Sequence, residues 1–322
     1  MLKRTSTIAI KRTKINEKKF AFGKQVNKMY VDAIENVGRF TRPMITVQKS
    51  YASKTILPGT ATLFFVNDEG CAVTCKHVAE ILINEMKIAK GYAEYSALRN
   101  QIPKDAQYNS NLRKLQARFS ITPQTLQQLK YIFIECFDTY TSIDIVIHPL
   151  YDLALLKFKG FSQRKYAGHA VFLKTATHAK QGRSLCRLGF PFPEFQNYEL
   201  DENTEEIRWT ATPAITPRFP IEGILTRLVM ENGEISGIEM STPGLRGQSG
   251  GPLFDSNGII YGMQSSTRHV HLGFDIVDQE ILSQGHPKKV TDYQFLNLGI
   301  CIPAEIIKNF LKQQNVAYFE SD

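Results

Sequence analysis

Short apolar segments of strand length, separated by turn-forming residues, recur from residue 44 onward and restrict the folds open to this chain. Among them are ITVQKSY at 45–51, TATLFFV at 60–66, CAVTC at 71–75, DLALLKF at 152–158 and LGICIP at 298–303. Ser256, Asn257 and Gly258 lie between two apolar runs, which is a strong signal of a tight hairpin. Many short strands joined by turns are typical of a β-barrel, so we expect a mainly β fold.

Two stretches break this pattern and favour helices. Between about 84 and 135, apolar residues recur at helical spacing, and Thr122-Pro123 is typical of a helix start, so we expect a mostly helical insertion. Near the end of the chain, residues 304–313 predict an amphipathic helix. The apolar face of that helix consists of Ile306, Ile307, Phe310 and Leu311.

Basic charge is concentrated at the start of the sequence. Residues 1–42 contain eleven lysines and arginines against three acids, which accounts for the whole formal net charge of +8. We therefore interpret residues 1–43 as a basic N-terminal extension, with a short helix expected within 24–40. The neutral remainder argues against nucleic-acid binding by the folded body. The extension is either a solvated segment or a docking segment for a partner, an anionic surface or a nucleic acid.

Cysteine usage indicates a reducing compartment. The five cysteines are an odd number, and Cys71 and Cys75 form the only near pair, without a second Cys/His pair at zinc-finger spacing. We expect no disulfide framework, no metal ion and no organic cofactor. The sequence has no apolar run of membrane-spanning length and no secretory signal, so we expect a cytoplasmic protein without a membrane span. An organellar transit peptide is the alternative, because residues 1–16 contain no acid.

Glycines surround one serine hydroxyl in TPGLRGQSGGPLF, residues 242–254. Glycine loses more conformational entropy on folding than other residues, so this concentration needs a reason. Backbone N–H groups that are aimed in advance stabilise the oxyanion formed when a serine attacks a carbonyl. We expect the amides of Gly247 and Ser249 to form such an oxyanion hole. Gly250 and Gly251 would then let neighbouring chain pass close behind the nucleophile.

A serine nucleophile needs a base and an orienting acid. Among seven histidines, His77 directly follows an apolar strand, and we expect surface or structural roles for the other six. Asp152 borders the apolar run of residues 153–156, where a carboxylate is costly to bury unless it is hydrogen-bonded. An imidazole N–H is a suitable partner. Asp144, with a similar apolar flank, remains the rival acid.

At this point the sequence resembles the trypsin-like, chymotrypsin-fold serine peptidases. The motifs that carry the resemblance are AVTCKHV around His77, YDLALLKF around Asp152 and RGQSGGPLF around Ser249, in the family's His–Asp–Ser order. LGFPFPE at 188–194 and LGICIPAEIIKNFL at 298–311 are similar to the bacterial, disulfide-free branch related to the HtrA-type proteases.

This resemblance implies a peptidase domain over 44–322 that is a chymotrypsin-like double β-barrel. The first barrel, with the helical insertion, would occupy 44–160, and the second barrel, with the C-terminal helix, would occupy 161–322. The catalytic site would lie in the crevice between the barrels. His77 and Asp152 would come from the first barrel and Ser249 from the second.

Several positions depart from the family's pattern. Gln248 occupies the place of the aspartate that pairs with a new N-terminal amine in secreted trypsins, so activation by an amine is not expected. Val78 occupies the place of a cysteine. The chain has no room for a PDZ domain after the terminal helix, so it is not a full HtrA protease. The insertion accounts for the long separation between His77 and Asp152.

When the family's pocket positions are carried over to this sequence, none of them is a carboxylate. This disfavours substrates that place Lys or Arg in the pocket. Arg246 at the rim, with Arg268 and His269 nearby, would favour an acidic residue, and its alternative is a solvated arginine. Thr267 occupies the place of a pocket-wall glycine, which would exclude a large side chain. The pocket residues would be Pro243, Arg246, Gln264, Ser265, Ser266 and Thr267.

Two functions follow. The first is an intracellular serine endopeptidase that cleaves protein or peptide substrates through an acyl-enzyme. Its restraint would come from the insertion or the N-terminal extension, which would gate the crevice or recruit substrate. The alternative is a protease-fold binding or sensing module that acts by docking a partner through either of those segments.

Overall fold

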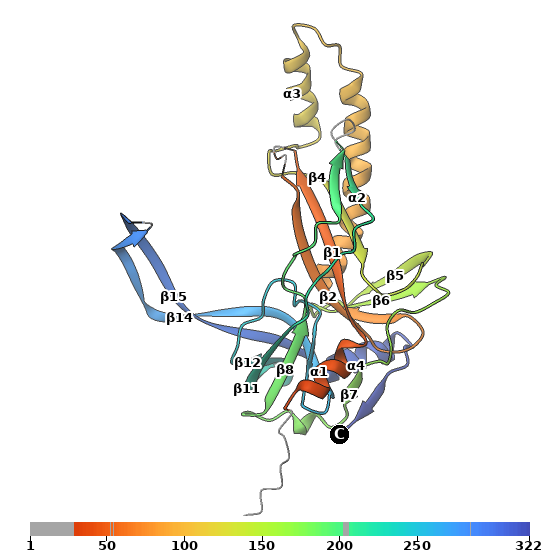
Figure 1. Cartoon of the computed structure of the whole chain (residues 1–322), viewed down its shortest axis with the longest axis vertical. Coiled ribbons are helices and arrows are strands. Elements are labelled where there is room, and N and C mark those ends of the chain that lie inside the picture. The colour runs from red at the N-terminus through yellow and green to blue at the C-terminus, as the bar shows by residue number, and fades with distance from the viewer. Residues whose placement is uncertain (1–28, 52, 54, 202–205, 284) are drawn as a thin grey trace, which may run out of the picture.

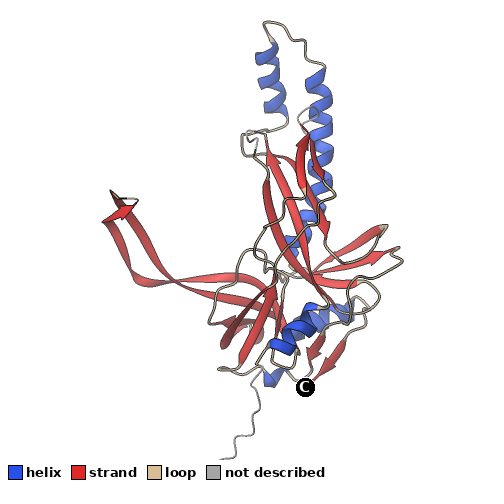
Figure 2. Ribbon diagram, viewed as in Figure 1, coloured by secondary structure: helices blue, strands red, loops and turns tan. Residues whose placement is uncertain are grey.

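The computed structural model describes residues 29–51, 53, 55–201, 206–283 and 285–322. Residues 1–28, which contain most of the expected basic extension, lie outside the described residues. Two large, mostly antiparallel sheets contain most of the described strands (Figures 1 and 2), which confirms the expected mainly β fold. Among the described helices, none combines the length and the apolar composition that a membrane span requires.

The first sheet has six strands in the order β4-β1-β2-β3-β6-β5. Strand β3 is buried along its whole length because β2 and β6 flank it and apolar side chains cover both of its faces. The strands of this sheet, in chain order, are β1 (Thr41–Ser50), β2 (Leu57–Phe65), β3 (Cys71–Thr74), β4 (Leu126–Phe133), β5 (Ser142–Ile147) and β6 (Ala154–Lys159).

The second sheet closes on itself. Its order is β13-β8-β11-β12-β15-β14-β7-β16, and β13 also pairs with β14, so six of its strands form a closed ring. This closure confirms a barrel in the second half of the chain. Its strands are β7 (Val171–Leu173), β8 (Ser184–Gly189), β11 (Phe219–Glu231), β12 (Glu234–Met240), β13 (Pro252–Phe254), β14 (Ile260–Ser283), β15 (His286–Pro303) and β16 (Phe319–Ser321). A separate small sheet pairs β9 (Tyr198–Asp201) with β10 (Glu206–Trp209).

Helices lie at the ends and in the insertion. α4 (Ala304–Gln313) forms where the sequence predicts it, with Ile307, Phe310 and Leu311 buried. α1 (Val31–Gly38) buries Ala33 and Val37, so residues 30–43, expected in the extension, are part of the folded body. The described part also contains α2 (Lys76–Asn100), α3 (Tyr108–Arg118) and a short 3-10 helix, η1 (Ala176–His178).

The insertion differs from the prediction at both ends. α2 begins at Lys76, so His77 lies in its first turn rather than at a strand end. The segment after Thr122, expected as helix, forms β4 instead and pairs with β1. Pairing with an existing sheet outweighs the helical spacing of its apolar residues. The two helices form a hairpin that projects from the first sheet (Figure 1), and no residue of α3 is buried.

One core joins both sheets. It contains Phe64 and Phe65 of β2, Leu155 of β6, and Leu253 and Phe254 of β13. The two halves also meet through backbone hydrogen bonds at the edge of this core, where the amide of Thr62 donates to the carbonyl of Ser249 at 3.0 Å. A strand of the first sheet therefore holds the loop of the second half that contains Ser249.

Candidate active site

Ser249 lies in the loop between β12 and β13, and two consecutive tight turns shape this loop. The amide of Gln248 donates to the carbonyl of Leu245 at 3.0 Å, which closes the first turn. Gly247 is the third residue of that turn and has a φ of +91°, which a type II turn requires and a side chain disfavours. The amide of Gly251 closes the second turn on Gln248 at 2.8 Å, with Gly250 at a φ of +86°.

The glycines after Ser249 also allow close packing, as the sequence predicts. A Cβ atom on Gly250 would overlap the carbonyl of Thr62, and one on Gly251 would overlap the carbonyl of Leu188. A Cβ atom on Gly247 would lie 2.5 Å from the carbonyl oxygen of Phe190. Neighbouring backbone therefore surrounds the loop on several sides and fixes its conformation.

Three amides of this loop remain available to a ligand. Within the described residues, the N–H groups of Gly247 and Ser249 have no hydrogen-bond acceptor, and neither does that of Arg246. In contrast, the amides of Gln248 and Gly250 are bonded to Leu245 and Gln264. Unpaired N–H groups beside a serine hydroxyl are what stabilisation of an oxyanion requires.

His77 and Asp152 are in direct contact. Nδ1 of His77 lies 2.9 Å from Oδ2 and 3.0 Å from Oδ1 of Asp152. The backbone amide of His77 also donates to Oδ1, at 3.0 Å. Because that amide belongs to the first turn of α2, the carboxylate also satisfies a free N–H at the positive end of the helix. Asp152 therefore fixes both the ring and the backbone of His77.

Ser265 links this pair to Ser249. It lies at a β-bulge of β14, where two residues oppose one on β15, and it has no partner in the strand register. Its hydroxyl donates to Oδ2 of Asp152 at 2.7 Å, and its carbonyl accepts the hydroxyl of Ser249 at 3.5 Å. Within the described residues, no hydrogen bond joins Ser249 to His77.

The contact shifts the pKa values of both partners. The hydrogen bond to Asp152 raises the pKa of His77, and burial opposes this effect only in part. Burial raises the pKa of Asp152, but the hydrogen bonds from the His77 ring and amide and from Ser265 outweigh it and lower the pKa. At neutral pH, Asp152 is therefore an anion that stabilises the protonated imidazole.

The rival acid and the other histidines lie elsewhere. Asp144 is on β5, mostly exposed, with Lys159 4.0 Å from its carboxylate. His148 accepts the amides of Leu150 and Tyr151 through Nδ1. The contacts of the next four are His169 with Phe319, His178 with Asp322, His269 with Asn297 and His271 with Asp275. His286 is exposed on β15, opposite Ser283.

Cys75 also lies beside His77 and Asp152, and one donor atom from each of the three falls within 4.8 Å of the others. A metal-binding cysteine must lose its proton. Burial and the neighbouring charge of Asp152 raise the pKa of the Cys75 thiol well above its ordinary value. The oxygens of Asp152 already accept His77 and Ser265. This donor set does not fit a metal ion. All five cysteines of the chain are buried and free.

The expected substrate pocket is filled by the chain's own side chains. The amide of Gly244 donates to the hydroxyl of Thr267 at 3.1 Å, and that hydroxyl donates to the carbonyl of Gly244 at 2.9 Å. Behind this contact, the side-chain amide of Gln264 donates to the carbonyl of Ser266 at 2.7 Å and lies against Gly244. Thr267 and Gln264 therefore pack against Gly244 where the sequence predicts the pocket.

Arg187 of β8 lies beneath Gln264 and is fully buried. Nη1 donates to Oε1 of Gln264 at 2.6 Å, and Nη2 donates to the carbonyl of Thr242 at 3.0 Å. Its Nε has no partner within the described residues, and no described carboxylate pairs with the guanidinium. Burial lowers its pKa accordingly. An unbalanced cation therefore lies under the pocket floor.

The structure separates the predicted pocket residues into different roles. Gln264 and Thr267 fill and close the pocket, whereas Ser265 binds Asp152 rather than lining the pocket. Ser266 is exposed, and Pro243 is half-buried beside the Gly244 wall. Arg246 is exposed at the rim, and Arg268 lies 3.5 Å from the carboxylate of Glu239, so Arg268 is not free to attract an acidic substrate.

Two residues that contact the candidate site were not predicted from the sequence. Thr62 of β2 donates its hydroxyl to the carbonyl of Gly247 at 2.7 Å and thereby holds the turn that presents the free amides. Arg187 was the other. Its signal in the sequence was a charge inside the apolar strand SLCRLG, where a cation is costly unless it has partners.

Comparison with known proteins identifies the family of the chain. A family model described as a trypsin-like peptidase domain matches residues 59–263. The search of curated proteins gave no match. Two similar solved structures are the HtrA-type protease AlgW with decapeptide, at 13% identity and a TM-score of 0.46, and the same protease with tripeptide, at 12% and 0.44. Each match covers 88% of this chain and 66% or 62% of the other, so this chain spans less than two thirds of their length.

Proposed function

Because the chain belongs to the trypsin-like peptidase family, we propose that it is a serine endopeptidase with Ser249 as nucleophile, His77 as general base and Asp152 as the orienting acid. The observation that carries the proposal is the double role of Ser265. Its hydroxyl binds Asp152, and its carbonyl accepts Ser249, so one bulged residue brings the dyad and the serine loop together.

The reaction uses these groups in sequence. When a peptide binds, the hydroxyl of Ser249 turns from Ser265 toward Nε2 of His77 and transfers its proton as its oxygen attacks the scissile carbonyl. The amides of Gly247 and Ser249 donate to the oxyanion. His77 then protonates the leaving amine, which leaves an acyl group on Ser249. Water, deprotonated by His77, hydrolyses that ester and restores the serine.

The side chains at the expected pocket support a proposal for the substrate class. P1, the substrate residue on the amino side of the cleaved bond, would enter between Gly244 and Thr267, where Gln264 already occupies the space. We therefore assign a small P1 residue, glycine, alanine or serine, in a protein or peptide substrate. This replaces the expected attraction of an acidic residue by Arg246.

A cytoplasmic location is consistent with the free cysteines of the chain. The five free cysteines are stable as thiols in a reducing compartment. Without amine-triggered activation at Gln248, restraint of the enzyme would depend on the filled pocket and on the segments that project from the body.

The test uses purified protein and a fluorophosphonate probe. We expect the probe to label Ser249 and a peptide library to be cleaved after small residues. Ser249→Ala should abolish both, whereas Ser266→Ala, an exposed neighbour of the dyad, should retain both. Cleavage that persists in Ser249→Ala would contradict the proposal.

A binding or sensing module is the second candidate, and the filled pocket is the observation that favours it. In that case the intact protein would bind a partner but leave the peptide library uncut. Ser249→Ala would then retain every cellular function of the protein.

A further inference from the structure

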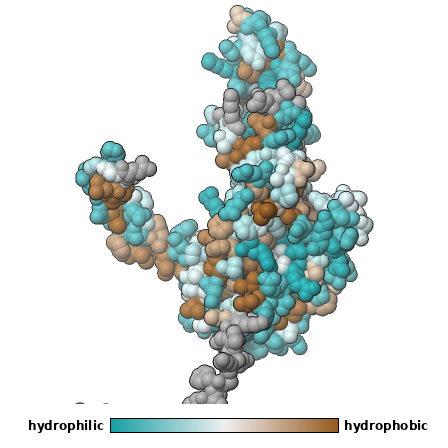
Figure 3. All heavy atoms as spheres, viewed as in Figure 1, coloured by the Kyte–Doolittle hydropathy of each residue, from teal (hydrophilic) through white to brown (hydrophobic). Residues whose placement is uncertain are grey.

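The outer part of the β14–β15 hairpin leaves the body as a long ribbon (Figures 1 and 3). We call residues 268–298 of this hairpin the arm. The two strands pair with each other from Gly262 and Pro303 to Ser283 and His286. Beyond Thr267 and Gly299, neither pairs with another described strand. The arm therefore has two open edges and two faces in contact with water.

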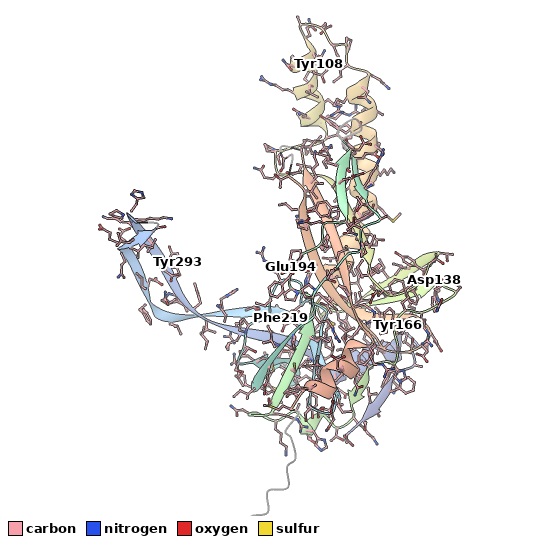
Figure 4. All side chains as sticks on the ribbon, viewed as in Figure 1. Tyr108, Asp138, Tyr166, Glu194, Phe219 and Tyr293 are labelled. Atoms are coloured by element: carbon pink, nitrogen blue, oxygen red, sulfur yellow. The ribbon has the colours of Figure 1, made fainter. Side chains whose placement is uncertain are left out.

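Apolar side chains cover the arm. The exposed ones are Leu272, Phe274, Val277, Ile281, Leu282, Tyr293, Phe295 and Leu296, with exposed fractions from 42% to 76%. Figure 3 shows brown surface along the length of the ribbon, and Figure 4 shows the side chain of Tyr293 on it. The other exposed large apolar side chains, from Met29 to Phe319, are spread over different elements of the body.

Both faces of the ribbon carry this apolar surface. Phe295 pairs with His271, and Leu296 pairs with Val270. Consecutive residues of a strand point to opposite faces, and both Phe295 and Leu296 are more than two-fifths exposed. A two-stranded hairpin is only marginally stable in water when nothing covers a face. The arm therefore needs a partner layer.

The arm has almost no net charge, so it does not favour a strongly charged partner. The arm contains Arg268 and two lysines against four acids, and Glu280 pairs directly with Lys289 across the hairpin. Two such arms would not repel each other. Over both faces together, the eight exposed apolar side chains offer on the order of 800 Å² per copy, which is comparable to the area that each partner of a standard interface buries.

We propose that the arm associates with the arm of a second copy of this chain around a two-fold axis. An isologous contact needs a self-complementary surface, and the arm is the one described surface of matching size and apolar character. The open edges supply backbone hydrogen bonds, and the apolar faces supply the buried area. Because β14 continues into Ser265 and Thr267, dimerisation also holds the strand that contacts Asp152 and closes the pocket.

The association is tested on the full chain by sedimentation velocity at micromolar concentration. We expect wild type to be a dimer and a triple arm variant, Phe274→Ser, Leu282→Ser and Tyr293→Ser, to dissociate with a dissociation constant raised at least a hundredfold. The matched control replaces exposed apolar residues outside the arm, Met86→Ser, Leu150→Ser and Ile215→Ser, and should remain a dimer. A monomeric wild type, or an arm variant that dimerises as well as the control, overturns the proposal.

Cross-linking gives a second readout that does not depend on stability. The natural cysteines are buried, so Tyr293→Cys offers a single accessible thiol. A bifunctional maleimide should link two copies through it, whereas Tyr140→Cys, on an exposed site away from the arm, should stay unlinked. A dimer in which Tyr293→Cys is not linked would show that another surface forms it. The Ser249→Ala variant should dimerise as wild type does, so a failure of the proposed catalysis would leave this test intact.

Discussion

The hydroxyl of Ser265 donates to Asp152 from a β-bulge, at 2.7 Å. A regular strand would alternate side chains strictly between two faces, and the extra residue re-aims this one. The same bulge leaves the carbonyl of Ser265 available to the hydroxyl of Ser249. A single irregularity in β14 thus serves both the acid and the nucleophile of the proposed enzyme.

Removing this hydroxyl tests its positioning role. Ser265→Ala deletes one of three donors to Asp152, and a hydrogen bond to a charged group contributes about 1.5–3 kcal/mol. We expect kcat to fall roughly tenfold or more, with KM little changed, since the group does not touch substrate. Steady-state kinetics with a peptide substrate measures this split. Ser266→Ala is the matched control, and an equal loss in both variants would argue against a specific role for Ser265.

The pH dependence follows from the His77–Asp152 contact. His77 must be neutral to accept a proton, and its pKa is raised, so kcat/KM should rise with pH through a midpoint above the ordinary histidine value of about 6.5. Asp152→Asn removes the charge and should move this midpoint down, while kcat falls by about 10⁴-fold. The pH profile of kcat/KM and an NMR titration of the ring measure both effects. An unchanged midpoint in Asp152→Asn would contradict the assigned pair.

The free energy of unfolding should also depend on pH through His77 and Asp152, and the two residues act in opposite directions. The raised pKa of His77 contributes stability that is fully present below about pH 6.5 and is lost as pH rises through its folded pKa. The lowered pKa of Asp152 contributes stability present above the ordinary carboxyl range and lost as pH falls through its folded pKa. The His77–Asp152 pair therefore contributes most to the stability between the ordinary carboxyl range and about pH 6.5.

Substrate choice should change when the pocket floor is opened. Gln264→Ala removes the side chain that fills the pocket and uncovers the guanidinium of Arg187, while the backbone bonds of residue 264 with Gly250 and Gly251 remain. We expect the preferred P1 residue to change from small to aspartate or glutamate by at least tenfold in relative kcat/KM. Cleavage profiling with a peptide library measures the change.

The matched variant combines Gln264→Ala with Arg187→Met. It opens the same space without the cation, and it should accept larger apolar residues but no acids. If the single variant keeps the preference of wild type, Gln264 does not limit the pocket.

The sequence was informative where a local pattern and the tertiary environment agree. α4 begins and ends as its amphipathic spacing predicts, because the face with Ile307 and Phe310 packs on the core. The segment around Leu129 was wrongly expected as a helix, because spacing cannot report that β1 offers an edge to pair with. The bulge at Ser265 depends on strand register, which no short motif encodes, whereas the apolar strand around Arg187 does indicate the burial of that residue.

α2 places the imidazole of His77 at the base of a helix of 25 residues, which is about 37 Å long at 1.5 Å per residue. The same helix buries Tyr95 near its far end, beside Tyr51 and Phe119, so the element that carries the ring is anchored at both of its ends. A molecule that displaced the outer hairpin near Tyr108 (Figure 4) would therefore strain the same helix that positions His77.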